Sequence, residues 1–182
     1  VDIGTHKEIR KKYSDKLVKD FGNSVIFPGF INAHVHLEEP LLEERPTDYL
    51  DYLRTKPDLG QENTQKIAKQ VLNNIQESHE AGVVAFANFS ETGICREDAF
   101  EEEYFCRVFM ELSGFRKIDA PDIFRKYNKI IENHEMSKNL TYHYAFSNLW
   151  NTSPELLRMI SAHELHTVLH FGMLEEERDF FL

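Results

Sequence analysis

The chain has 182 residues, 41% of them hydrophobic and 29% charged, which is enough to bury the core of one ordinary domain. Its formal net charge of -10 argues against a nucleic-acid partner, because phosphates are repelled by a surface of this sign. No apolar run approaches the length that a bilayer requires, so we expect no membrane partner. Two cysteines and the lack of a secretory segment favour a reducing cytoplasm.

The two ends of the chain predict that it is a piece of a longer protein. It starts at Val1 without an initiator Met and ends in the helix-like segment "EEERDFFL" at residues 175–182. The first segment, up to Ser24, is polar and rich in turn-forming residues, with a brief helix expected around residues 7–13.

Five apolar runs typical of buried strands alternate with helical patterns along the rest of the chain. The first run, "VIFPGFINAHVH" at residues 25–36, has its start marked by Pro28 and Gly29. Ser153 and Pro154 are typical of the start of a helix, since Ser caps free amides and Pro suits the first turn. The other strands are expected at 83–89, 106–112, 140–146 and 167–171, and the main helices at 62–81, 97–104, 121–134 and 153–164.

This alternation predicts a parallel α/β sheet. The strands are almost continuously apolar, as expected when both faces of a sheet are covered. No glycine-rich dinucleotide fingerprint follows a strand, which argues against a Rossmann fold. A (β/α)8 barrel needs eight such units, and this chain would supply five of them.

Two histidines, His34 and His36, stand one residue apart at the end of the first strand. Residues i and i+2 of a strand point to the same face, and active sites of barrels lie at the carboxyl ends of the strands. Two neutral imidazoles on one face form half of a zinc or iron site. The pattern alone leaves open a structural pair in an open binding module.

The segment "PGFINAHVH" at residues 28–36 resembles the hallmark of the amidohydrolase superfamily, which carries Pro-Gly-x-Ile-(Asp/Asn)-x-His-x-His on its first barrel strand. Residues 152–171 are similar to the family's fourth-unit helix and fifth strand. "RTKPDLG" and "GVVAFANFSETG" are similar to the branch of cytosine deaminases and chlorohydrolases. The resemblance implies a TIM-type (β/α)8 barrel. Residues 28–182 would hold its first five β/α units, and residues 1–27 would be a remnant of a small flanking β-sandwich with its lead-in.

The resemblance also implies a metal site. The family's third histidine, on the fifth strand, matches His170 in "VLHFG", so His34, His36 and His170 are the expected ligands of one divalent metal, with zinc preferred and iron as the alternative. A further histidine on the sixth strand and an Asp on the eighth would lie beyond this chain. Three ligands leave an open position, as catalytic zinc requires, and a metal so held makes hydroxide available.

One departure from the family leaves two functions open. Met173 stands where the deaminase branch has a Glu that shuttles protons, and a thioether cannot move the required proton. The first function is a metal-dependent hydrolase of a non-peptide C–N bond in a small molecule, which would be an amide, a cyclic amide or an amino-heterocycle. The alternative is a relative that keeps the fold, with or without the metal, and has lost turnover.

The residues expected to touch substrate lie on the loops and strand ends around the histidines. Glu38 could equally be a solvated loop acid, and His143 could equally be a satisfied core histidine. An unclosed sheet would also leave edge strands to be covered, so homo-oligomerisation is possible. The candidate substrate contacts are Glu38, His143, Asn148 and Trp150.

Overall fold

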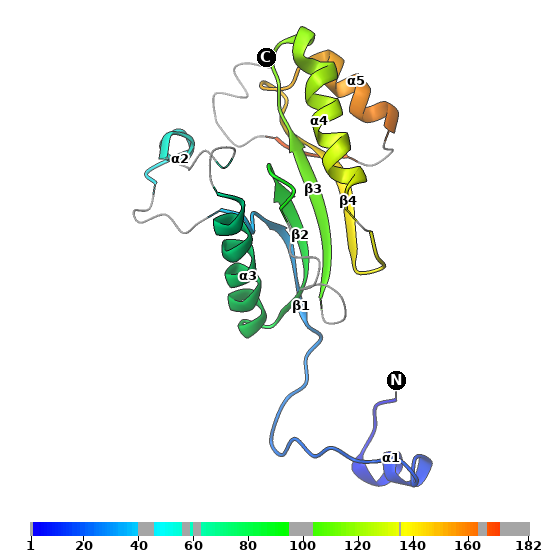
Figure 1. The fold of residues 1–182 in the computed structure, drawn as a ribbon. Coiled ribbons are helices and arrows are strands. Elements are labelled where there is room, and N and C mark those ends of the chain that lie inside the picture. Colours follow the sequence, from blue (N-terminus) through cyan, green and yellow to red (C-terminus); the bar gives the residue numbers. More distant parts are fainter. Residues whose placement is uncertain are drawn as a thin grey trace.

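The computed structural model describes residues 2–39, 46–55, 59, 63–94, 104–134, 136–163 and 167–171. Five parallel strands form one sheet in the order β1-β2-β3-β4-β5 and curl into part of a barrel (Figure 1). The strands are β1 (Phe30–Val35), β2 (Val83–Ser90), β3 (Phe105–Leu112), β4 (Leu140–Asn148) and β5 (Val168–His170). The helices are α1 (His6–Lys12), α2 (Tyr49–Thr55), α3 (Thr64–Glu80), the 3-10 turn η3 (Lys117–Asp119), α4 (Ala120–Glu132) and α5 (Pro154–His163).

The five predicted strands and the main helices predicted at 62–81, 121–134 and 153–164 are confirmed, with boundaries that differ by a few residues. Helix α3 ends before Gly82, whose φ of 89° is a conformation that favours glycine. Helix α5 begins as expected, because the Leu156 amide donates to the Ser153 hydroxyl at 3.3 Å. The helix predicted at residues 97–104 lies outside the described residues except for Tyr104.

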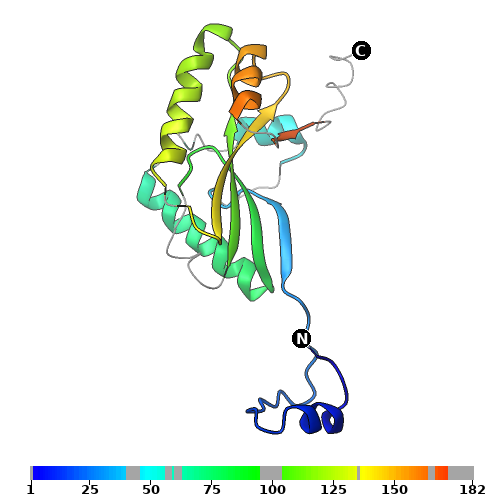
Figure 2. The ribbon, with the colours of Figure 1, turned by 90° about the vertical axis from the view of Figure 1, so that its right-hand side faces the viewer.

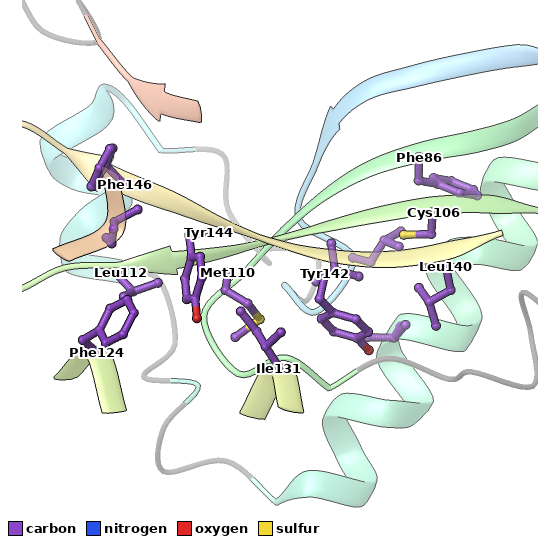
Figure 3. Close-up of a cluster of buried hydrophobic side chains, with 14 of the residues drawn as sticks. Phe86, Cys106, Met110, Leu112, Phe124, Ile131, Leu140, Tyr142, Tyr144 and Phe146 are labelled. Atoms are coloured by element: carbon purple, nitrogen blue, oxygen red, sulfur yellow. The ribbon is translucent and has the colours of Figure 1, made fainter. Parts of the chain in front are cut away.

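The hydrophobic core lies between one face of the sheet and the helices, as Figure 2 shows with α3 and α4 on the same side of the strands. Alternate residues of β3 and β4 point into this core, where Phe124 and Ile131 of α4 meet them (Figure 3). Val108, Met110 and Leu112 of β3 are fully buried there. The helices therefore cover the outer face of the curled sheet, as they do in a barrel.

The Pro-Gly pair before β1 is explained by a close approach to β2. A Cβ atom on Gly29 would lie 2.4 Å from Cγ2 of Val84, a distance that real Cβ contacts do not reach. Only glycine lets the start of β1 come this near to its neighbour. Proline at position 28 costs no ladder hydrogen bond here, because β1 begins two residues later.

A register shift in β1 decides which way the two histidines point. Asn32 is opposite Phe86 and Val35 is opposite Asn88, so three steps along β1 match only two along β2. Without this extra residue, His34 would face the helices together with Asn32. Instead Val35 packs against the helix-side core, and the ring of His34 stacks on Phe89. The shift is a β-bulge, a feature that commonly re-aims a side chain near an active site.

The inner face of the sheet is concave and partly apolar. At the amino-terminal ends of the strands it has a hollow of about 340 Å³, lined by Ile31, Ala33, Ala85 and Ala87 among others. Ile31 keeps 73% of its surface exposed. The histidines lie at the opposite, carboxyl ends of the strands, so this hollow is separate from them.

The amino-terminal segment lies apart from the sheet. Helix α1 is capped by Thr5, and an extended stretch connects it to β1 (Figures 1 and 2). Several large apolar residues of this stretch are more than half exposed, among them Phe21 and Ile26. The division into residues 1–27 and 28–182 stays a prediction. Among the helices of the described residues, none is both long and apolar enough to cross a bilayer.

We expect the 182-residue chain expressed by itself to self-associate. Strands β1 and β5 are the edges of the sheet, and the inner face exposes Ile31 and Phe105. Light scattering after size exclusion should therefore give a mass above 21.4 kDa, and a hydrophobic dye should bind. A monomer with a sharp, reversible unfolding transition would contradict this expectation.

Candidate metal centre

Three histidines from β1 and β5 come together at the carboxyl ends of the strands. Each can offer one ring nitrogen such that these atoms all lie within 4.8 Å of one another. The Nε2 atoms of His34 and His170 are 2.9 Å apart although 136 positions separate the two residues. The structure thus brings together His34, His36 and His170, the residues expected from the sequence to be ligands.

The ring of Phe89 on β2 forms the floor beneath these histidines. It stacks on His34 with centroids 4.1 Å apart, and its centroid lies 5.9 Å from that of His36 and 5.2 Å from that of His170. Only 2% of Phe89 is exposed, so the floor is fixed by packing. An apolar floor leaves the imidazole nitrogens as the polar groups that can bind an ion above it.

A buried carboxylate that the sequence analysis did not single out lies beside two of the three rings. Glu111, near the end of β3, has Oε1 at 3.0 Å from Nδ1 of His170 and Oε2 at 3.5 Å from Nδ1 of His36. It is 6% exposed. A signal was present, since Glu111 is an isolated acidic residue at the carboxyl end of the apolar run "CRVFMEL".

The pKa values of His170 and His34 shift in opposite directions. The carboxylate of Glu111 raises the pKa of His170 above its ordinary value, against the effect of burial. Burial lowers the pKa of His34, and the neighbouring imidazoles His170 and His36 lower it further. His34 is therefore favoured in the neutral form, which is the form that binds a metal.

The surroundings of the site are acidic on the helix side as well. Burial raises the pKa of Tyr127 on α4 to about 12, and the charges of Glu91, Glu38 and Glu111 add to this effect. The phenol consequently stays neutral at any physiological pH. Glu38 follows β1, Glu91 follows β2, and Glu111 lies on β3, so these three carboxylates place negative charge around Tyr127. Glu111 and Glu39 act on His170 in the same sense, which favours a cation there.

The donor set fits a divalent transition metal. Three imidazoles from two strands meet on a dry aromatic floor, and Nδ1 of His170 is engaged by Glu111 and by the Ser147 carbonyl, each at 3.0 Å. An imidazole so held turns its other nitrogen outward, which is the usual arrangement of metal-binding histidines. Nitrogen donors of this kind suit zinc and iron and do not suit calcium or magnesium.

Glu38 lies next to the cluster, and the structure gives its carboxylate partners from β2 and the turn that follows. Both oxygens accept hydrogen bonds, from the Ser90 and Thr92 hydroxyls at 2.8 and 2.7 Å and from the Glu91 amide at 2.5 Å. The side chain is only 2% exposed. Burial raises its pKa, while these hydrogen bonds act in the opposite direction. Glu38 therefore joins the ends of β1 and β2, and a contact with substrate stays a prediction.

Asparagine side chains hold the backbone that follows His36. The Leu37 amide donates to Asn88 Oδ1 at 2.9 Å, and Asn74 of α3 donates to the carbonyls of Leu37 and Glu39. Tyr52 of α2 donates to the Glu39 carboxylate at 2.5 Å. The segment after the histidine pair is thus fixed to β2, α2 and α3, which restricts where His36 can lie.

The other residues expected to touch substrate have different positions. His143 lies on the inner face of β4, where its ring is 5.5 Å from that of Phe109 and its Nε2 is 3.0 Å from the Thr141 hydroxyl. Asn148 is buried, and its Oδ1 accepts from the Asn151 amide at 2.8 Å, so it shapes the turn before α5. Trp150 is half-buried in that turn, and Met173 lies outside the described residues.

A model of the amidohydrolase family matches residues 25–180, which is most of the chain. The chain belongs to the amidohydrolase family. The resemblance of "PGFINAHVH" to this family is thereby confirmed. A comparison with curated proteins gave no match.

Solved amidohydrolase-like structures share the fold of this chain. Aminofutalosine deaminase from Helicobacter pylori is 19% identical with a TM-score of 0.72, over 97% of this chain and 43% of that one. Atrazine chlorohydrolase from Arthrobacter aurescens TC1, solved in complex with zinc, is 14% identical with a TM-score of 0.64, over 85% and 43% respectively. The five parallel strands therefore correspond to part of a (β/α)8 barrel, and the chain spans less than half the length of these proteins.

Replacing Glu38 by Ala should destabilise the full-length protein by about 3 kcal/mol, because the buried donor on Ser90 and the part-buried donors on Glu91 and Thr92 would lose their acceptor. Urea unfolding would measure this change in the free energy of unfolding. As a control, Glu77→Ala on the exposed face of α3 should change it by less than about 0.5 kcal/mol. Equal effects of the two substitutions would contradict a structural role for Glu38.

Proposed function

We propose that the full-length protein is a metal-dependent hydrolase that cleaves a non-peptide C–N bond in a small molecule. The substrate would be an amide, a cyclic amide or an amino-substituted heterocycle. His34, His36 and His170 would hold one divalent ion, with zinc preferred over iron. The observation that carries this proposal is the meeting of these three imidazoles at the carboxyl ends of β1 and β5.

The comparisons support the same class of reaction. The family match covers the strands that carry all three histidines. The structural neighbours include a deaminase and a chlorohydrolase, and the latter was solved with zinc. A divalent ion in a site of this kind supplies Lewis acidity, which makes water a nucleophile at neutral pH.

The residues of this chain would provide binding and orientation around that ion. Phe89 stacks against the ring of His34, and the carboxylate of Glu111 lies against the Nδ1 atoms of the other two rings. His143 is the described polar side chain that we favour for substrate binding, since it lies on the same inner face as Phe109 and Phe89. Glu38, Asn148 and Trp150 remain weaker candidates for such contacts.

A catalytically inactive relative is the second candidate, and Met173 is the observation that favours it. Glu111 faces the Nδ1 atoms of His170 and His36, so it does not stand in for the proton-shuttling Glu of the deaminase branch. In this case the protein would bind the metal without turnover. We further propose a cytoplasmic protein, either monomeric or assembled from identical copies.

Metal analysis and a substrate panel would test the proposed function. The full-length protein should contain one equivalent of zinc or iron and hydrolyse at least one member of a panel of amides, cyclic amides and amino-heterocycles. Removal of the metal by a chelator should abolish turnover, and added zinc should restore it. His170→Ala should weaken metal binding by more than about 100-fold, which exceeds the usual effect of a residue outside the ligand set.

His143→Ala is the matched control, because it removes an imidazole from the same inner face that is not one of the three possible ligands. Its metal content should equal that of the wild type, whereas KM should rise if His143 contacts the substrate. Stoichiometric metal without turnover on the whole panel would favour the inactive relative. Failure of the full-length protein to bind a divalent metal would reject both readings.

A further inference from the structure

The buried carboxylate of Glu111 lies behind two of the proposed metal ligands, His36 and His170. The proposed metal site does not by itself assign a role to this carboxylate. Both ion-pair contacts given for Glu111 among the described residues are to imidazole rings, those of His36 and His170. At 6% exposure the carboxylate has lost nearly all its hydration, which is costly unless charged or hydrogen-bonding partners replace the water. The two imidazoles are those partners.

Glu111 contacts the histidine rings on the side away from the proposed metal, so it is not a candidate ligand. It lies against Nδ1 of His170 and Nδ1 of His36, whereas Nε2 of His170 points to Nε2 of His34 at 2.9 Å. The cluster of possible ligand atoms among the described residues consists of the three histidines and does not include Glu111. The carboxylate therefore stands on the far side of the rings from the place where an ion would lie.

This placement selects one tautomer of His170. Its Nδ1 faces two acceptors at 3.0 Å, Oε1 of Glu111 and the carbonyl oxygen of Ser147. Only a proton on Nδ1 satisfies them, and this leaves the lone pair of the neutral ring on Nε2. Oε2 of Glu111 lies 3.5 Å from Nδ1 of His36, so the same carboxylate also favours a proton on that nitrogen, by charge and over a longer distance. One rigid carboxylate on β3 thus sets the orientation of rings from β1 and β5.

We propose that Glu111 is a positioning residue that holds His170 and His36 with their Nε2 atoms turned toward the metal, and thereby strengthens metal binding. This inference rests on the proposed metal site. It adds a residue from a strand that supplies no ligand.

The test is the metal affinity of the full-length protein carrying Glu111→Gln. Glutamine keeps the volume of the side chain, but it has one acceptor oxygen and a donor amide in place of two acceptors. We expect affinity for Co²⁺ and Zn²⁺, measured by chelator competition, to fall about 10- to 100-fold. The absorption spectrum of bound Co²⁺ should also change, because the orientation of two ligands is altered.

Glu39→Gln is the matched control. Glu39 is also a carboxylate near His36, but its Oε1 is 3.8 Å from Nδ1 and its Oε2 accepts from Tyr52. Its substitution should change the affinity for metal less than about threefold. Equal affinities for wild type and Glu111→Gln would overturn the inference and leave the proposed function standing. Absence of metal binding by the wild type would overturn both.

A second measurement needs no substitution and does not depend on the folding of a variant. Nitrogen-15 spectra of labelled histidines in the metal-free wild-type protein distinguish the two tautomers of a neutral imidazole. The resonances of His170 should report a proton on Nδ1, as the two acceptors require. A neutral His170 ring with its proton on Nε2 and none on Nδ1 would overturn the inference, whatever the affinities of the variants.

Discussion

The convergence of three imidazoles depends on a single extra residue in β1. The register shift between Asn32 and Val35 turns His34 and His36 to the inner face, while Val35 returns to the helix-side core. A second shift lies opposite β5, where β4 advances two residues, from Phe146 to Asn148, for one step to His170. These irregularities adapt regular parallel strands, whose side chains alternate strictly, to a site that needs side chains from both edges of the sheet.

Two buried acids beside the cluster show how the same residue type serves different ends. Glu38 accepts hydrogen bonds from backbone and hydroxyl donors at the end of β2, and the dipoles of these donors stabilise its charge. These hydrogen bonds join the end of β1 to the end of β2. Glu111 has imidazoles as its partners, so its charge acts on the rings themselves. In both cases burial would be unfavourable without these partners, and the partners are what give each acid its role.

The two faces of the sheet differ, because helices cover the outer face and leave the inner face open among the described residues. The apolar residues of β3 and β4 that point outward are covered by α4, and those of β2 by α3. The inner face has no such cover among the described residues, and apolar groups such as Ile31 stay exposed there. In the similar solved structures, this chain corresponds to less than half of a longer protein.

The sequence by itself determined the order of strands and helices, the family and the three histidines, because these depend on local periodicity and on a short motif with fixed spacing. It could not determine the role of Glu38, since whether an acid after a strand is solvated or buried depends on donors 52 to 54 residues away. The position of Glu111 at the end of an apolar run is visible in the sequence, but its contact with the histidines is not. Its partners are 75 residues before it and 59 after it, and only the curling of the five-stranded sheet brings side chains from the ends of β1, β3 and β5 together across its inner face.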